Sequence, residues 1–519
     1  TGTAVSRLTG LIRIVVFGVI VGQTSLADAF DSANNSPNAI YELLIGGVLS
    51  ASLVALFAQF IERDEYQDGD SRSQDAIISV SLIALVVITA LAVICAPAIF
   101  HLFSLNPAQG IDIEVFRSVG TSLTRIFVFQ IFFYGLSALT SALLNARKLF
   151  FAAAWSPVLA NVVTIGSFLL LPLTSAGSDL SIASVHNDQT AMWVLGLGTT
   201  LGIATMAITQ VLVARRHGFT FSFLPHFRHP AVVKLIQLST WTLGYVAANQ
   251  VALVVIKNLA SPGSGGVDAY SKAFVLLQLP HGLLAVSIAT TFVPDLARMF
   301  HRGDHAEFSS TMARGIRLTA MLTFPASVGL FVLSKPLIGL LLQHGNFTDS
   351  AAINTARALS GLALGLAGFS VYLFVLRGFY ARNDTRTPFF INVVENVLNI
   401  LFALVLVDRH GVFGLGIAFS IAYIVSAVIA LVVLESTEVD IKMSKLMLSL
   451  LRIAIAATAM GAVVWTVSNA IGSNAGIGSA ERVVSGAIIG AITYAIALSA
   501  LGDRELRNYL SSKITRSSR

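Results

Sequence analysis

The chain has 519 residues, of which 55% are hydrophobic and only 12% are charged, and its mean hydropathy is +0.79. Soluble domains carry about 25% charged residues, so this composition excludes a water-soluble fold. Apolar runs of about 20 residues, the length that crosses a bilayer core, recur along the chain and do not alternate as barrel strands do. The chain is therefore predicted to be a polytopic helical membrane protein.

The predicted fold is all-α, with about fourteen transmembrane helices. Spans are expected near residues 3–22, 37–61, 75–103, 115–144, 151–173, 191–213, 233–259, 268–296, 310–333, 352–380, 388–407, 412–434, 446–470 and 482–502. No basic segment or cleavage site precedes the first apolar run, so no removable signal peptide is expected. The single cysteine, Cys95, lies in an apolar run and is expected to pack in the core.

The distribution of lysine and arginine supports this count. Fourteen spans place both termini on one side of the membrane. If that side is the cytoplasm, most loop lysines and arginines are cytoplasmic, and the opposite loops hold only Lys335 and Arg409. This asymmetry follows the positive-inside rule and accounts for the net charge of +6 without a nucleic-acid partner.

A long basic connection after the sixth span suggests two lobes. It covers residues 214–232 and would separate an N-terminal lobe of six spans, residues 1–213, from a second lobe of six spans, residues 233–434. Two further spans and a basic cytoplasmic tail would occupy residues 435–519. Many transporters are built from paired helical bundles of this kind.

The first span carries the most informative charges, Arg7 and Arg13. An arginine at mid-bilayer costs about 2.5–3.5 kcal/mol, so it must face a wet cavity, pair with an acid or snorkel to the interface. The two arginines lie about 120° apart around a helix, so both could border one broad cavity. Such a cavity favours an anionic ligand, because a guanidinium can hold two phosphate oxygens at once. The alternative is that one or both arginines snorkel.

Three acids follow this span. Asp28 and Asp31 lie at its outer end, and Glu42 opens the next span. The simplest interpretation is that they are solvated acids at helix starts. The functional alternative is that they are gating acids, which pair with a cation when one side of the protein closes.

Lys272 lies near the start of the eighth span, followed by Pro280 and His281. Lys272 is either a cavity cation or an interfacial lysine. The proline removes a helical hydrogen bond, and neighbouring groups must satisfy the freed carbonyl. His281 is either a packed polar residue or a proton relay.

The eleventh span carries a polar stripe. Asn392, Glu395, Asn396 and Asn399 have the i, i+3, i+4, i+7 spacing that puts them on one helical face. Such a stripe could coordinate a cation or carry a proton. The alternative is ordinary hydrogen bonding between helices.

Enzyme motifs are missing from the sequence. There is no Walker-type phosphate loop, HExxH, CxxC pair or GxSxG. A transport function would therefore use an ion gradient, the membrane potential or the substrate gradient.

Six ordered segments carry a resemblance to a known family. They are SRLTGLIR (6–13), ADAFDSANNSPNAIYELLIGGVLSASLVALFAQF (27–60), LLNARKLFFAAAWSPVLANVV (143–163), LLQLPHGLLAVSIATTFVPDLAR (276–298), LLQHGNF (341–347) and RGFYARNDTRTP (377–388). Together they resemble the MurJ/MviN family of lipid II flippases, within the multidrug/oligosaccharidyl-lipid/polysaccharide exporter superfamily. The resemblance implies two six-helix lobes around a cationic central cavity, two C-terminal helices that form a groove for the lipid tail, and alternating access.

The resemblance also assigns roles to residues of the first span. The family's substrate-binding serine and arginines correspond to Ser6, Arg7 and Arg13, and its outer acid to Asp28. Two positions depart from the pattern. Tyr41, followed by Glu42, stands where the family often has an arginine. Phe274 and Val275 stand where it often has an acid–arginine pair, and Lys272 is expected to supply the missing charge.

The function predicted from the sequence is a lipid II flippase of the bacterial inner membrane, not an enzyme. It would need no cofactor, and its driving force would be sodium, protons or the membrane potential. Its partners would be lipid II, membrane lipids and wall-synthesis enzymes. Two alternatives stay open: an exporter of another undecaprenyl-linked glycan, or a non-transporting membrane scaffold for wall synthesis.

Overall fold

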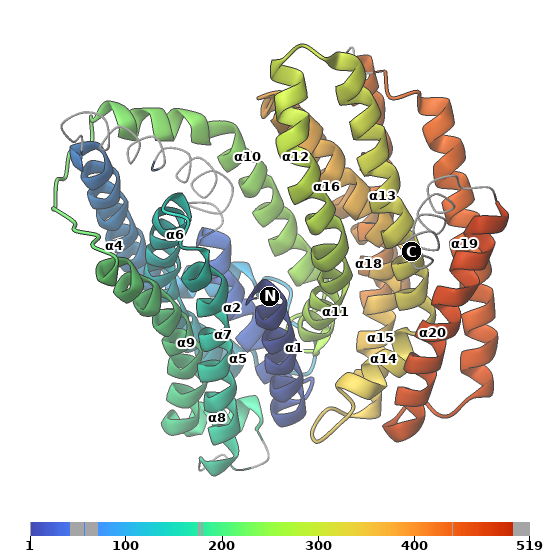
Figure 1. Ribbon diagram of the computed structural model, residues 1–519. Coiled ribbons are helices and arrows are strands. Elements are labelled where there is room, and N and C mark those ends of the chain that lie inside the picture. The colour runs from blue at the N-terminus through green and yellow to red at the C-terminus, as the bar shows by residue number, and fades with distance from the viewer. Residues whose placement is uncertain are drawn as a thin grey trace. The chain divides into compact units, whose positions relative to one another are not determined.

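The computed structural model describes residues 2–41, 57, 71–174, 177, 180–437 and 440–501. Within these residues the regular structure is helical and contains no strand (Figure 1). The prediction of an all-α membrane protein is confirmed.

The chain forms two compact units. Unit 1 consists of Thr1–Asp268 and His344–Thr348, and unit 2 consists of Ala269–Gln343 and Asp349–Arg519. The lobe boundaries predicted around the basic linker 214–232 stay a prediction.

Unit 1 is a bundle of nine α-helices in the part of the chain that the structure describes. They are α1 (Gly2–Val21), α2 (Ser25–Tyr41), α4 (Ser71–Leu102), α5 (Ile113–Phe127), α6 (Gln130–Ala146), α7 (Phe150–Leu170), α8 (Ile182–Asn187), α9 (Gln189–Arg216) and α10 (Pro230–Leu259). Interlocking rings fill one part of its core. Phe30 packs between Phe17, at a centroid distance of 4.6 Å, and Phe127, at 5.3 Å.

Small residues bring α7 and α9 into close contact. A Cβ on Gly202 of α9 would lie 2.7 Å from the Ala160 main-chain oxygen of α7 and 2.5 Å from Thr164 Oγ1. Helices in a membrane lack a hydrophobic driving force toward one another, and close backbone approach at small residues replaces it. Helix α7 also packs against α1.

Unit 2 contains the remaining helices. They are α11 (Gly266–Pro280), which begins in unit 1, the π-helical turn η3 (His281–Ala285), α12 (Val286–His301), α13 (His305–Val332), α14 (Ser334–Leu341), α15 (Asp349–Ala363), α16 (Leu366–Ala381), α17 (Arg386–His410), α18 (Val412–Ser436), α19 (Met443–Ala470) and α20 (Gly476–Ala500). Helix α18 packs against α15, α16 and α17, while α19 packs against α13 and α20.

The structure supports eleven membrane spans, or up to twelve, among the described residues. The twelfth is the pair α15 and α16, which is bent by 46°. The predicted count of fourteen is not confirmed. Most of the expected span 37–61 lies outside the described residues. The expected span 233–259 falls on α10, where the apolar stretch among the described side chains is Leu243–Leu259.

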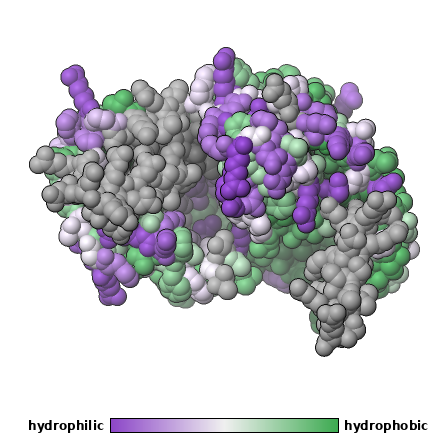
Figure 2. Space-filling model, turned by 45° about the horizontal axis from the view of Figure 1, so that its top comes forward, coloured by the Kyte–Doolittle hydropathy of each residue, from purple (hydrophilic) through white to green (hydrophobic). Residues whose placement is uncertain are grey.

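Many large apolar side chains face outward. Ile94, Val405 and Ile496 are 75%, 71% and 65% exposed. Exposed apolar surface on this scale is typical of helices that face lipid. Figure 2 shows hydrophobic flanks, with hydrophilic side chains gathered at the end that comes forward. Cys95 was wrongly expected in the core: it is exposed on α4, on the same outward side as Ile94.

Candidate substrate and gating sites

A polar clamp fixes the start of α1 against α7. Asn161 Nδ2 donates hydrogen bonds to the Ser6 main-chain oxygen at 3.1 Å and to Thr9 Oγ1 at 3.0 Å. Gly10 lies beside this clamp, where an added Cβ would make an ordinary van der Waals contact with Asn161 Nδ2 at 3.7 Å. Ser6 therefore acts in this clamp through its backbone, and the clamp sets the rotation of α1 and the directions of its two arginines.

Arg7 and Arg13 are both half-buried on α1. Arg13 makes no hydrogen bond or ion pair with any residue that the structure describes, although its charge acts on the nearby Tyr134 of α6. A guanidinium in an apolar span that keeps its donors available is suited to bind an oxyanion. An arginine with its donors tied to a carboxylate would be a structural residue, and no described carboxylate holds Arg13 in this way.

Asp28 is fully buried and caps a helix that is distant in sequence. Its Oδ2 atom accepts the main-chain N–H groups of Gly263 and Gly265, both at 2.8 Å, and its Oδ1 atom accepts that of Asp268, also at 2.8 Å. These donors belong to the first turn of α11 and the loop before it. A carboxylate is favoured there because it satisfies free N–H groups and faces the positive end of the helix dipole. The interpretation of Asp28 as a solvated acid is therefore wrong.

Lys257 adds a buried cation beside this cap. Its side chain is 3% exposed at the end of α10, and it interacts electrostatically with Asp31, Asp28 and Asp268. The sequence analysis missed the pairing of Lys257 with these acids. A lysine near the end of an apolar segment was the available signal, but the acids that surround it come from two other helices.

Another segment of unit 1, His344–Thr348, meets the C-terminal end of α1. The Asn346 N–H donates to the Val19 main-chain oxygen at 2.9 Å, and Asn346 Nδ2 donates to that of Ile20 at 2.7 Å. Gly345 adopts φ +57°, and a Cβ there would lie 2.6 Å from the Val19 oxygen. The segment His344–Thr348 is thus bound to the last turn of α1, shortly before the helix that carries Asp28.

Other predicted residues are placed less completely. Glu42 lies outside the described residues, and Tyr41 ends α2 with a side chain that is not described. Lys272 is buried on α11, at 4% exposed, and its role as a cavity cation stays a prediction. Phe274 packs edge-on against Phe419 at a centroid distance of 5.8 Å. Because Arg7 and Arg13 belong to unit 1 and Lys272 to unit 2, their convergence on one chamber stays a prediction.

All four residues of the polar stripe lie on one buried face of α17. Glu395 is 1% exposed, and Asn392, Asn396 and Asn399 are also buried. Neither Glu395 oxygen, nor Asn399 Oδ1, has a hydrogen bond of normal geometry within the described residues, although Tyr423 of α18 approaches the carboxyl group. Buried acceptors normally have partners, and a cation or a proton is a partner that fits these oxygens.

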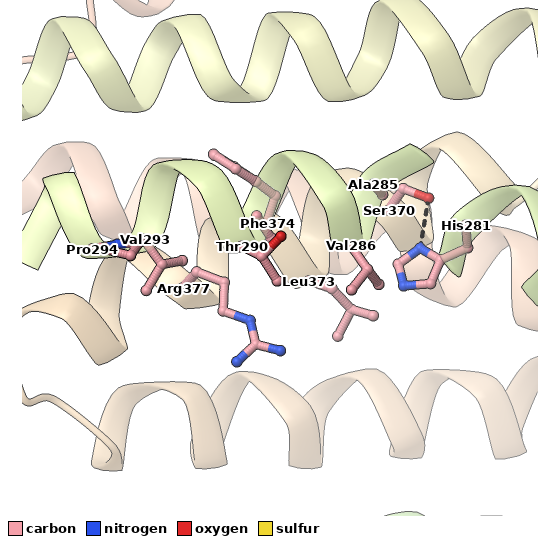
Figure 3. Close-up of a pocket in the computed structure, with 11 residues that line it drawn as sticks. His281, Ala285, Val286, Thr290, Val293, Pro294, Ser370, Leu373, Phe374 and Arg377 are labelled. Atoms are coloured by element: carbon pink, nitrogen blue, oxygen red, sulfur yellow. Dashed lines mark hydrogen bonds between the residues drawn. The ribbon is translucent and has the colours of Figure 1, made fainter. Parts of the chain in front are cut away.

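A pocket of about 270 Å³ lies between α12 and α16 of unit 2. Figure 3 shows its two polar ends: His281 Nδ1 and Ser370 Oγ are 2.9 Å apart at one, and Arg377 lies at the other. Val286, Leu373 and Phe374 are among the apolar residues between them. His281 begins the π-helical turn, and its ring lies 4.6 Å from the Phe369 ring. Its role as a packed polar residue or a proton relay stays a prediction.

The sequence analysis missed Arg377 as a pocket residue. It falls within the expected span 352–380, and the structure places it inside α16, one turn before the end of the helix. Its spacing from Ser370 was the available signal, because seven residues are two helical turns and put both on one face. Among the described residues there is no group of three or more His, Cys, Asp or Glu side chains that could hold a metal ion.

The multi-span helical fold is shared with solved membrane transporters. Solved structures with this fold include one described as "Lipid II flippase MurJ, inward closed conformation", with a TM-score of 0.76 and 23% identity over 97% of this chain and 98% of that chain. Another is an inward-facing multidrug resistance MATE family transporter of the MOP superfamily, with a TM-score of 0.68 and 14% identity over 85% of this chain and 99% of that chain.

The family model described as "Lipid II flippase MurJ" matches residues 17–482, and the chain belongs to this family. Relatives include the probable lipid II flippases MurJ of Rhizobium meliloti, 29% identical over 82% of this chain and 77% of that protein, and of Haemophilus influenzae, 29% identical over 89% and 90%. The lipid II flippase MurJ of Burkholderia cenocepacia is 27% identical over 81% and 79%. The resemblance seen in the sequence motifs is confirmed.

Proposed function

We propose that this chain moves lipid II from the cytoplasmic to the outer leaflet of the bacterial inner membrane. The family match and the names of its relatives support this substrate. The structural observation that carries the proposal is Arg13: a half-buried guanidinium inside an apolar span, with no hydrogen-bonded partner among the described residues. The positive-inside pattern supports an orientation with both termini in the cytoplasm.

The chemical task is to give the pyrophosphate of the substrate a partner where lipid offers none. An arginine side chain without a partner at mid-bilayer costs about 2.5–3.5 kcal/mol on insertion scales. The pyrophosphate of the substrate also loses its hydration there. Bringing the two opposite charges together offsets both costs. Arg7 and Arg13 on α1 are the first candidates for this contact, with Ser6 at the start of the same stretch. Lys272 and Arg377 offer cations on unit 2.

The Asp28 cap would act as the outer gate. Each of its three hydrogen bonds joins a charged acceptor to a backbone donor, and such bonds contribute about 1.5–3 kcal/mol each. Opening the outer end requires their release. Lys272 lies four residues after Asp268 on α11, so a shift of the capped end of this helix would also move a buried cation. Binding of the anionic head and opening of the gate would thus share one helix. Glu42 remains a second proposed gating acid.

The stripe on α17 would carry the coupling ion of a secondary transporter. The Glu395 carboxyl and the amide oxygens of Asn392, Asn396 and Asn399 are buried on one helical face, and oxygen donors of this kind hold sodium or a proton. Tyr423 and Tyr270 lie close enough to interact with the carboxyl group.

Complementation of a flippase-depleted bacterial strain tests the proposed function. The wild-type chain should restore growth, while Arg13→Ala, expressed at the same level, should not. The control Arg409→Ala removes an exposed arginine at the end of α17 and should behave as wild type. Growth restored by Arg13→Ala would favour the scaffold alternative. If the wild-type chain fails to restore growth but exports a different undecaprenyl-linked glycan, the result would favour the alternative of a glycan exporter.

A further inference from the structure

A second pocket of unit 2 lies away from the proposed transport residues. It has a volume of about 430 Å³ and is lined by the start of α13 and by the connection that leads from α18 into α19. We call it the basic pocket. Its lining residues are His305, Ala306, Ser309, Ser310, Ala313, Arg317, Asp440, Ile441, Lys442, Lys445 and Leu446.

The charge of the basic pocket is strongly positive. Arg317, Lys442 and Lys445 contribute three permanent cations against one carboxylate, Asp440. The acid is partly occupied, because its Oδ1 atom accepts the Lys442 main-chain N–H at 3.1 Å. A cavity with this balance favours a ligand that carries an oxyanion.

The backbone holds Lys442 in an unusual conformation at the pocket wall. Lys442 has φ +52° and ψ +59°, the left-handed region that residues with a side chain rarely adopt. It immediately precedes α19, and the Met443 N–H donates to Glu435 Oε1 at 3.1 Å. Such conformations persist only where the surrounding structure determines them, and they cluster at ligand sites.

Helix length places the basic pocket at the membrane boundary. Helices α13 and α19 have 28 residues each, or about 42 Å at 1.5 Å per residue, against a hydrocarbon core of about 30 Å. The apolar parts of both helices are their C-terminal parts. The polar starts, with Ser310 on α13 and Lys445 on α19, therefore extend into the headgroup layer. Figure 2 shows hydrophilic side chains at this end of unit 2 above hydrophobic flanks.

We propose that the basic pocket binds the phosphate group of an anionic glycerophospholipid, of the phosphatidylglycerol class, from the surrounding leaflet. Basic pockets between membrane helices are suited to such headgroups. The two lysines and Arg317 contact the phosphate, and the hydroxyl of Ser310 and the ring of His305 lie where a glycerol headgroup would extend. The buried Ile441 and Leu446 form the apolar floor. This site is independent of lipid II transport and does not rest on it.

Native mass spectrometry of the full chain in detergent, titrated with phosphatidylglycerol, tests the site. The variant Lys442→Gln/Lys445→Gln changes two exposed side chains. Each lysine near a lipid phosphate is worth roughly fivefold in binding, so the double variant should lose most of its bound lipid. The matched control is Lys335→Gln/Arg409→Gln, which removes two exposed charges from elsewhere on unit 2 and should retain wild-type binding.

Two further arms identify the source of the phosphate. Phosphatidylcholine should bind weakly to all variants, because its headgroup has no net charge. Soluble glycerol phosphate should not compete at the concentrations at which the lipid saturates. Equal loss in the control variant would show only a general charge effect and overturn the proposal. Competition by soluble glycerol phosphate at equal concentration would show a free-phosphate site and overturn the lipid assignment.

Discussion

The Oδ1 atom of Asp28 accepts the main-chain N–H of Asp268 at 2.8 Å, across a sequence separation of 240 residues. This bond, with those to Gly263 and Gly265, joins the start of α2 to the start of α11. One side chain therefore satisfies the N-terminal donors of a helix that carries Lys272 one turn further on. The proposed gate is a helix cap supplied from another helix.

Asp28→Asn should weaken this cap. An amide offers one acceptor oxygen and directs its NH2 group toward a backbone donor, so at least one charge-assisted bond is lost, at about 1.5–3 kcal/mol. The expected results are a lower thermal unfolding midpoint in detergent and greater labelling of a cysteine introduced at Ser264 in the loop. Asp112→Asn is the control, because Asp112 is an exposed N-cap of α5 and asparagine caps equally well. No difference between the two variants would contradict the role of the cap.

Gly345→Ala should separate the segment His344–Thr348 from α1. Gly345 has φ +57°, and the new Cβ would lie 2.6 Å from the Val19 main-chain oxygen. Gly218→Ala is a matched control, since Gly218 has φ +77° with no atom within 4 Å of the added Cβ. Both variants bear the backbone strain of about 1–2 kcal/mol, and only the first adds the clash. Thermal unfolding should show a larger loss for Gly345→Ala; equal losses would mean that the contact with α1 is unimportant.

Glu395→Gln should abolish the dependence of transport on an ion gradient while leaving substrate binding intact. The amide has nearly the same shape as the carboxyl but cannot carry the negative charge that a cation or proton would neutralise. Transport is measured in vesicles with and without imposed sodium and proton gradients. Glu481→Gln, an exposed acid on α20, serves as the control. Unchanged gradient dependence in Glu395→Gln would remove the coupling role from α17.

Arg377→Gln should weaken binding of lipid II several-fold, and the loss should shrink as salt rises, because screening already reduces the lost attraction. Arg377 lies at one end of the α12–α16 pocket and is exposed to its opening. Binding is measured with the purified chain at low and high ionic strength. The control Arg302→Gln removes an exposed arginine just after α12. An effect of equal size in both variants would indicate general electrostatics rather than contact in the pocket.

The spans could be predicted from the sequence because each is a local property. A run of apolar residues such as 412–434 must be a helix in lipid, since only a helix satisfies its own backbone there. The polar stripe around Glu395 was found for the same reason, as its spacing is read within one helix.

The long-range partners could not be predicted. Nothing near Asp28 in the sequence indicates that Gly263, Gly265 and Asp268 will donate to it, because that contact depends on how the helices pack. The surroundings of Lys257 could not be predicted for the same reason. Its charge is evident in the sequence, but its proximity to Asp28, Asp31 and Asp268 depends on how the helices pack. The place of Arg377 in a pocket could not be predicted either, because the other wall of that pocket comes from α12.

The central claim is that Arg13 holds the anionic head of lipid II during transport. The most direct measurement is the amount of lipid II exposed on the outer leaflet of cells depleted of their own flippase and supplied with this chain. The account predicts that wild type and Arg409→Ala restore outer-leaflet lipid II, while Arg13→Ala leaves it inside despite normal expression and an unchanged unfolding midpoint. Full outer-leaflet exposure by Arg13→Ala would contradict the account.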